Sequence, residues 1–147
     1  MNIELLRADI SSIKVDALVY PSQSRHVDGV GEVPAGSAVV TSAGNLLCKF
    51  VIHAIGPRSD EKDQEKILRD ATLSALERAE ELAIASVAFM ASRTGMFGFP
   101  IDFCAPVMLD ATLAFRPRAR SLQRVIYCLF GAEAHESFRR ALEEIEQ

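Results

Sequence analysis

The chain has 147 residues, of which 49% are hydrophobic and 24% charged, as is usual for one compact globular domain. Its formal net charge of −4 argues against broad electrostatic attraction to nucleic acid. No apolar run is long enough to span a bilayer, and the opening MNIELLRADI lacks the features of a signal peptide. We therefore expect a single cytoplasmic domain, residues 1–147, that contacts neither membrane nor nucleic acid.

Three cysteines, Cys48, Cys104 and Cys128, lie far apart in apolar stretches. An odd number of scattered cysteines predicts reduced core thiols and not a disulfide framework or a zinc site. A nucleophilic cysteine is the alternative, but no local signature surrounds any of the three. We expect no metal and no cofactor.

The first third of the chain predicts strands. IELLRADI, residues 3–10, and VDALVYPS, residues 15–22, are short runs of strand-forming residues separated by the turn-like SSIK. Gly44-Asn45 separates GSAVVTSA from LLCKFVIHAIGP, which favours a hairpin. The run from Phe50 to Ile55 is almost entirely apolar, as in a strand buried on both faces.

The rest of the chain alternates between helix and strand. Ser59 or Asp60 can cap a helix over residues 60–83, whose inward positions are Ile67, Ala71, Ala75, Ala79 and Leu82. Strands are predicted at SVAFMA (86–91) and LQRVIYCLF (122–130), and helices at residues 101–115 and 134–147. Pro106 fits the second helix only if it lies in the first turn. This order predicts an α/β domain with a mixed central sheet.

The stretch SRTGMFGFP, residues 92–100, follows a predicted strand and precedes a predicted helix. In α/β sheets, ligands bind outside the carboxyl ends of the strands. Glycines let backbone N–H groups converge on an anion, and the helix N-terminus adds positive potential. The stretch lacks the Gly-Lys-Ser/Thr of a Mg-ATP loop. It fits a diphosphate loop, with a tight turn carrying core aromatics as the alternative.

Five segments, RADIS, PAGSAVVTSAGNL, KFVIHAIGP, SRTGMFGFP and RVIYCLF, occur in this order and resemble the macro domain, a family of ADP-ribose-binding modules. The resemblance covers almost the whole chain, and VIHAIGP and TGMFGFP are its most specific parts. It implies a mixed sheet sandwiched between helices. It also implies binding of ADP-ribose or a related nucleotide diphosphate.

The resemblance assigns the adenine half of the ligand to three residues. Asp9 would accept a hydrogen bond from the adenine amino group, the backbone of Ile10 would contact the ring, and Phe130 would pack against it. Each assignment has a structural alternative. Asp9 could hydrogen-bond only the turn into Ser11, and Phe130 could be a core residue.

The resemblance assigns the diphosphate to the loop made of Thr94, Gly95, Met96 and Phe97, with Phe97 also bordering the distal ribose. Phe97 could instead be a core residue. Arg93 stands where the family usually has Ser. Its guanidinium could bind a phosphate, or pair with Asp28 or Asp9 and plug the site. His53 in VIHAIG is expected to be a packed strand residue and not a ligand.

The chain departs from the family after the second predicted strand, where it reads YPSQSRHVDGV. The family usually has Asn-Ala-Ala-Asn, a run of glycines and Val-Asp-Gly. Tyr20 and Gln23 replace the two asparagines, and residues 24–26 replace glycines. Asp28 matches an Asp that can help activate water in hydrolytic members, and Gln23 would orient the sugar. We expect binding without efficient catalysis; the alternatives are an ADP-ribosyl or O-acetyl-ADP-ribose hydrolase and a degenerate member with an assembly role.

A helix that the family normally has between Val-Asp-Gly and the VPAGSAVV segment is missing. Only the four residues Val30 to Val33 (33 − 30 + 1) occupy the interval, too few for more than one helical turn. One sheet face then needs another cover. The remaining helices could shift inward, the Tyr20–His26 segment could fold over the gap, or a second copy could pack there. We expect a homodimer that uses the face near Tyr20 to Val33.

Overall fold

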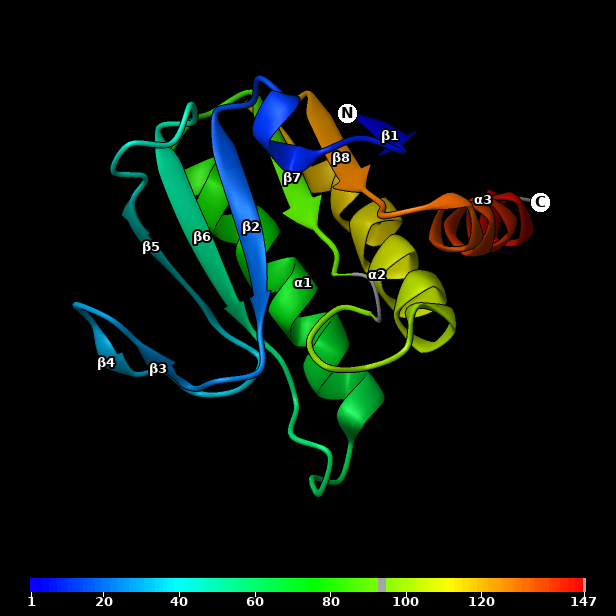
Figure 1. Cartoon of the computed structure of the whole chain (residues 1–147), viewed down its shortest axis with the longest axis horizontal. Coiled ribbons are helices and arrows are strands. Elements are labelled where there is room, and N and C mark those ends of the chain that lie inside the picture. Colours follow the sequence, from blue (N-terminus) through cyan, green and yellow to red (C-terminus); the bar gives the residue numbers. More distant parts are fainter. Residues whose placement is uncertain (93–94, 147) are drawn as a thin grey trace.

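The structure, a computed structural model, describes residues 1–92 and 95–146. Its centre is a six-stranded sheet with the order β1-β8-β7-β2-β6-β5 (Figure 1). The strands are β1 (Asn2–Leu6), β2 (Ala17–Ser22), β5 (Ala38–Ser42), β6 (Phe50–Ile55), β7 (Ser86–Met90) and β8 (Arg124–Cys128). β5 runs antiparallel to β6, and the other neighbouring pairs are parallel. The mixed sheet and the β5–β6 hairpin predicted from the sequence are confirmed.

Three α-helices flank the sheet: α1 (Gln64–Glu81), α2 (Ile101–Phe115) and α3 (Ala132–Glu146). They pack against one face, where alternate strand residues form the main core with them. Tyr127 of β8 stacks on Phe89 of β7, with ring centroids 4.8 Å apart, and contacts Phe138 of α3 at 5.0 Å. Burial raises the pKa of Tyr127, whose hydroxyl lies 2.7 Å from that of Thr112. The predicted α/β architecture with one helix fewer is confirmed.

The outer face of the sheet is covered by short segments of the same chain. The 3-10 helix η1 (Ile10–Ser12) and residues 43–49 lie over a cluster that includes Leu18, Ala88 and Ile126. Two short strands, β3 (His26–Val27) and β4 (Gly31–Glu32), form a hairpin that carries Val27 and Val33 onto Ile55. Residues 26–33 therefore fold over part of the face that the missing helix would cover.

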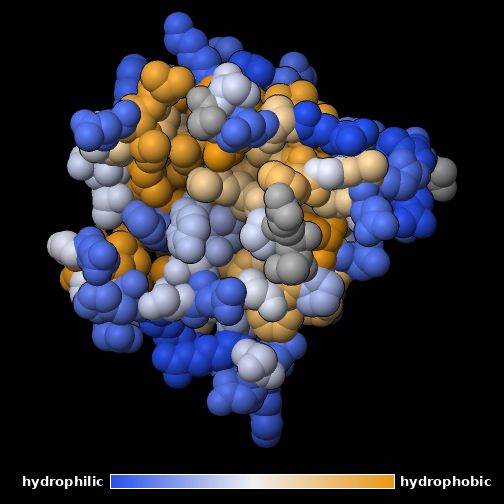
Figure 2. Space-filling model, viewed as in Figure 1, coloured by the Kyte–Doolittle hydropathy of each residue, from blue (hydrophilic) through white to orange (hydrophobic). Residues whose placement is uncertain are grey.

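Part of this outer face stays open to solvent. Tyr20 is 47% exposed, and the neighbouring loop presents Leu46 and Leu47, which are 55% and 79% exposed. Figure 2 shows apolar side chains gathered over the upper part of the face, around residues 43–49 and η1. In the part of the chain that the structure describes, no helix is long and apolar enough to cross a membrane.

Two expectations about the helices are wrong. α1 begins at Gln64 and not after Ser59 or Asp60; its N-cap, Asp63, has a positive φ of 60° and makes no side-chain cap hydrogen bond. The amide of Gln64 donates instead to the carbonyl of Ser59, at 2.8 Å, and so shapes the entry loop. Pro106 lies inside α2 beyond its first turn. The buried neighbours Ala105 and Val107 hold the helix on the core despite the lost backbone hydrogen bond.

Candidate functional site

The parallel strands bring the predicted site residues to one edge of the sheet. β1, β2, β6, β7 and β8 all end there: Leu6 and Met90 both lie opposite Cys128, and Ser22 lies opposite Ile55. The loops that follow these strands contain Asp9, Ile10, Gln23, Gly95, Met96, Phe97 and Phe130. Arg93 and Thr94 belong to the same loop as Gly95 but lie outside the described residues.

The loop after β7 contains a tight turn over residues 95–99. The N–H of Met96 donates to the carbonyl of Phe99 at 3.1 Å, and the N–H of Phe99 donates back at 2.9 Å. Phe97 and Gly98 both have positive φ, 58° and 81°, as in a type I′ turn. A Cβ at Gly95 would lie 1.8 Å from the carbonyl oxygen of Phe99, so only glycine fits there. Core packing and main-chain hydrogen bonds thus fix the turn.

The ring of Phe97 is a core element. Phe97 is 2% exposed, and a Cβ at Gly56 would lie 2.4 Å from its Cδ1, so the ring packs directly on the Gly56 backbone. Among the described residues, the N–H groups of Phe97 and Gly98 donate to no protein acceptor. Two adjacent free N–H groups in a left-handed turn can bind an anion. The Phe97 ring therefore packs beneath the turn and fixes its position on the Gly56 backbone.

The two residues that the resemblance connects with catalysis lie in different places. The amide of Gln23 lies over Gly98, where an added Cβ would be 2.5 Å from Gln23 Cδ. Asp28 lies at the tip of the β3–β4 hairpin, which projects away from the 95–99 turn (Figure 1). Its side chain is fully exposed, and its carboxylate lies 3.5 Å from Nε2 of His26. The structure brings Gln23 to the turn and leaves Asp28 apart from it.

Asp9, Ile10 and Phe130 border the other end of the edge. Asp9 is exposed, and its carbonyl accepts hydrogen bonds from the N–H and Oγ of Ser12, at 3.0 and 2.7 Å, which start η1. Ile10 is half-buried against the outer cluster. Phe130 is 54% exposed and lines a hollow of about 380 Å³ between the first turns of α2 and α3. Phe130 is thus a rim residue, unlike Phe97.

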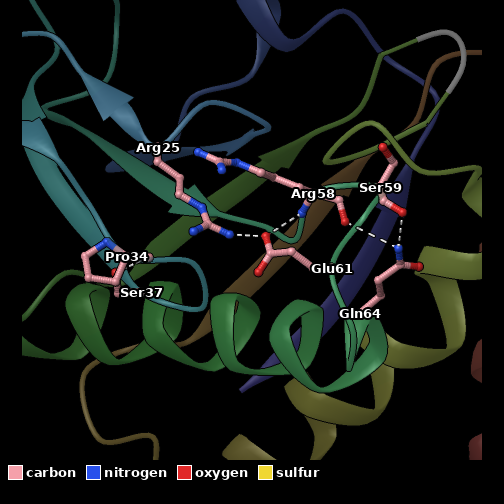
Figure 3. Close-up of polar contacts among 7 residues, drawn as sticks. All are labelled: Arg25, Pro34, Ser37, Arg58, Ser59, Glu61 and Gln64. Atoms are coloured by element: carbon pink, nitrogen blue, oxygen red, sulfur yellow. Dashed lines mark hydrogen bonds and ion pairs between the residues drawn. The ribbon is translucent and has the colours of Figure 1, made fainter.

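A charged cluster that the sequence did not reveal lies beside the turn, where the loops after β2 and β6 meet (Figure 3). Arg25 forms an ion pair with Glu61, and Glu61 also accepts the N–H of Arg58 at 2.8 Å. The Arg58 N–H and the Arg25 guanidinium hold the pKa of Glu61 below its usual value. Arg25 stands where the family has glycine. In the sequence, this pairing is indicated only by an acidic residue, Glu61, in the loop after the neighbouring parallel strand.

His53 lies on the open outer face, in the middle of β6. Its Nε2 is 2.8 Å from Oγ1 of Thr41, and its ring lies edge-on to that of Tyr20, with centroids 6.2 Å apart. Burial lowers the pKa of His53. Within residues 1–92 and 95–146, no group of three His, Cys, Asp or Glu side chains is arranged to hold a metal ion.

Comparisons with known proteins agree with this architecture. The family model for the Macro domain matches residues 20–108. The protein PAE1111 of Pyrobaculum aerophilum is 37% identical over 163 residues, which cover 94% of this chain and 89% of the relative. The Macro domain-containing protein TTE0995 of Caldanaerobacter subterraneus is 29% identical over 172 residues, covering 99% of this chain and 98% of that protein. Both alignments are longer than the 147 residues of this chain, so these relatives contain residues with no counterpart here.

Solved structures show the same fold at lower identity. The Oceanobacillus iheyensis macrodomain with ADP superposes with a TM-score of 0.85 at 21% identity, covering 98% of this chain and 91% of that chain. The Trypanosoma brucei macrodomain in complex with ADP gives a TM-score of 0.78 at 18% identity, covering 95% and 68%. The family match, the relatives and the fold lead to one conclusion: the chain belongs to the macro domain family.

Proposed function

We propose that this chain binds ADP-ribose or a related nucleotide diphosphate at the carboxyl edge of its sheet. The observation that supports this best is the 95–99 turn, whose two free N–H groups, on Phe97 and Gly98, sit at the end of a central strand of a macro domain. Such N–H groups suit a diphosphate, because they bind an anion without a metal. Macrodomains with 21% and 18% identity to this chain have been solved with ADP.

The adenine would lie between the loop after β1 and the loop after β8. Asp9 is exposed there and offers a carboxylate to the adenine amino group. Phe130 offers a half-exposed ring for stacking, and Ile10 offers its backbone. The distal ribose would approach Gln23, whose amide covers Gly98. Arg93 and Thr94 would contact the phosphates.

We propose that this binding takes place without efficient hydrolysis. Water activation needs a base within hydrogen-bond reach of the reacting centre. Asp28, the candidate base, is fully exposed on a hairpin that points away from the turn. The proposed setting is the cytoplasm, where the free Cys48, Cys104 and Cys128 would stay reduced.

Calorimetric titration tests the proposal. ADP-ribose should bind more tightly than ribose 5-phosphate, and Asp9→Ala should weaken ADP-ribose binding roughly tenfold, the value of one charge-assisted hydrogen bond. Asp110→Ala is the matched control, because Asp110 is an exposed, ion-paired carboxylate on α2. It should leave the affinity unchanged. The absence of heat at millimolar ADP-ribose would refute the proposed function.

A further inference from the structure

Arg25, Arg58 and Glu61 meet because β2 and β6 are parallel neighbours. Ser22 and Ile55 lie opposite each other at the strand ends, and the N–H of Gly56 donates to the carbonyl of Ser22 at 3.1 Å. The loops that follow therefore leave the sheet together. Figure 3 shows Arg25 reaching from one loop to Glu61 on the other.

Glu61 behaves as an anion held by two donors. A single carboxylate oxygen, Oε1, accepts both the N–H of Arg58, at 2.8 Å, and Nη2 of Arg25. Both contacts lower the pKa of Glu61, the Arg58 N–H more than Arg25. This is the donor set, one backbone N–H and one guanidinium, that proteins use for phosphate and carboxylate ligands.

Glu61 accepts a hydrogen bond from only one of the two parallel donors, Nε and Nη2, of the Arg25 guanidinium. Its Nε is buried and has no hydrogen-bond partner among the described residues. Nε–H and Nη2–H point the same way from one edge of a guanidinium, and together they match two oxygens of an oxyanion. Glu61 satisfies one of the two, and a buried donor without an acceptor is unfavourable. A tetrahedral oxyanion has enough oxygens for Nε, Nη2 and the Arg58 N–H at once.

We propose that Arg25 and the backbone N–H of Arg58 form a phosphate-binding site that the chain's own Glu61 occupies. A phosphate group displaces the carboxylate of Glu61, whose side chain is 25% exposed and can turn into solvent. The Arg58 guanidinium, exposed and without an ion-pair partner in residues 1–92 and 95–146, adds positive charge nearby. This site is separate from the N–H groups of the 95–99 turn and goes beyond the proposed nucleotide binding.

Inorganic phosphate is the probe, titrated calorimetrically at low ionic strength. Glu61→Gln keeps the side-chain size and removes the competing charge, so it should tighten phosphate binding about threefold or more. Glu77→Gln is the matched control: Glu77 also pairs with an arginine, Arg118 at 3.4 Å, but lies on α1. Adding Arg25→Ala to Glu61→Gln should abolish the gain, and Arg25→Lys should restore only part of it because lysine lacks the two-pronged donor.

The outcomes separate a binding site from a structural ion pair. An unchanged phosphate affinity in Glu61→Gln, or an equal gain in Glu77→Gln, overturns the proposal, provided that thermal melts show folded proteins. If Glu61→Gln does not fold, a phosphate affinity that is the same in the original chain and in Arg25→Lys overturns it instead. Competition with ADP-ribose identifies the source of the phosphate: displacement indicates a nucleotide phosphate, and simultaneous binding indicates free phosphate. Failure of ADP-ribose to bind would refute the proposed function but leave the phosphate result standing.

Discussion

Two loops at the carboxyl edge of the sheet, the 95–99 turn and the 22–33 segment, are held by different forces. The turn is fixed by main-chain hydrogen bonds and by a Phe97 ring packed on Gly56, which leave no room for another side chain. The 22–33 segment is anchored by the Arg25–Glu61 ion pair and by two buried valines, with its tip in solvent. The loop that matches the family motif is built into the core, whereas the loop that departs from it depends on contacts that a single surface substitution can remove.

Substitution of Gly95 should cause the largest loss of stability, because it places a side chain inside the tightly packed 95–99 turn. A Cβ in Gly95→Ala would meet the Phe99 carbonyl at 1.8 Å, and backbone cannot yield as a side chain can. We expect a loss of about 3 kcal/mol or more in the free energy of unfolding, measured by urea denaturation.

Gly44→Ala is the control for this prediction. Gly44 also has a positive φ, 59°, but nothing lies within 4 Å of an added Cβ, so only backbone strain of about 1–2 kcal/mol is expected. Equal losses in the two variants would mean that strain, and not the contact with Phe99, makes glycine necessary at position 95.

Self-association is the next expected effect, and it concerns the 22–33 side of the molecule. Tyr20 and Val30, 47% and 50% exposed, lie on the face that the missing helix would cover. We expect light scattering over a dilution series to give the mass of a homodimer, and Val30→Glu to shift it to the monomer mass. A monomer at every concentration would contradict this prediction and would mean that the β3–β4 hairpin and η1 cover enough of the outer sheet face to prevent self-association.

The pH dependence of stability should show how much the Arg25–Glu61 ion pair contributes to holding the 22–33 segment. The folded-state pKa of Glu61 is lowered from 4.5, so its contribution is fully present above that value and is lost as the pH falls through the folded pKa. Acidification from pH 7 should therefore destabilise the original chain more than Glu61→Gln. Urea midpoints at several pH values measure this, and parallel curves would assign no stabilising role to the pair.

The smallest effect is expected for Asp28→Ala. Its side chain is fully exposed, and its carboxylate lies 3.5 Å from Nε2 of His26, so the free energy of unfolding should change by less than about 0.5 kcal/mol. Turnover of O-acetyl-ADP-ribose should be slow or absent with and without the substitution. Robust turnover in the original chain that disappears in Asp28→Ala would establish the hydrolase alternative.

Most of the fold could be predicted because the apolar runs are clear. The runs around Phe50–Ile55 and residues 86–91 became central strands, and the periodic helical segments became α1, α2 and α3. Helix details failed where tertiary contacts override local signals. Asp63, which precedes α1, has a left-handed conformation and makes no side-chain cap hydrogen bond, so the sequence does not indicate where the helix begins. Pro106 stays in α2 because its neighbours are buried.

The site was only partly predictable. The glycines and aromatics after β7 predicted a turn, and the type I′ geometry accounts for the positive φ of Gly98. Which phenylalanine is buried could not be predicted, because Phe97 is buried by its contact with Gly56, a residue far away in the sequence, whereas Phe130 is 54% exposed. The Arg25–Glu61 contact joins positions 36 residues apart in the sequence, and only the parallel pairing of β2 and β6 brings them together.

The thiol of Cys104 allows the opening rate of the 95–99 turn to be measured. It donates to the carbonyl of Met96 at 3.3 Å, and burial raises its pKa to about 12, so it is almost wholly protonated at neutral pH. Cys104 is fully buried against the 95–99 turn, so movement of the turn off the first turn of α2 would expose it to an alkylating reagent. With the other two free cysteines, Cys48 and Cys128, replaced by Ser, the labelling rate of Cys104 measures opening of the turn. A ligand that binds the turn should lower the labelling rate of Cys104 in proportion to its occupancy.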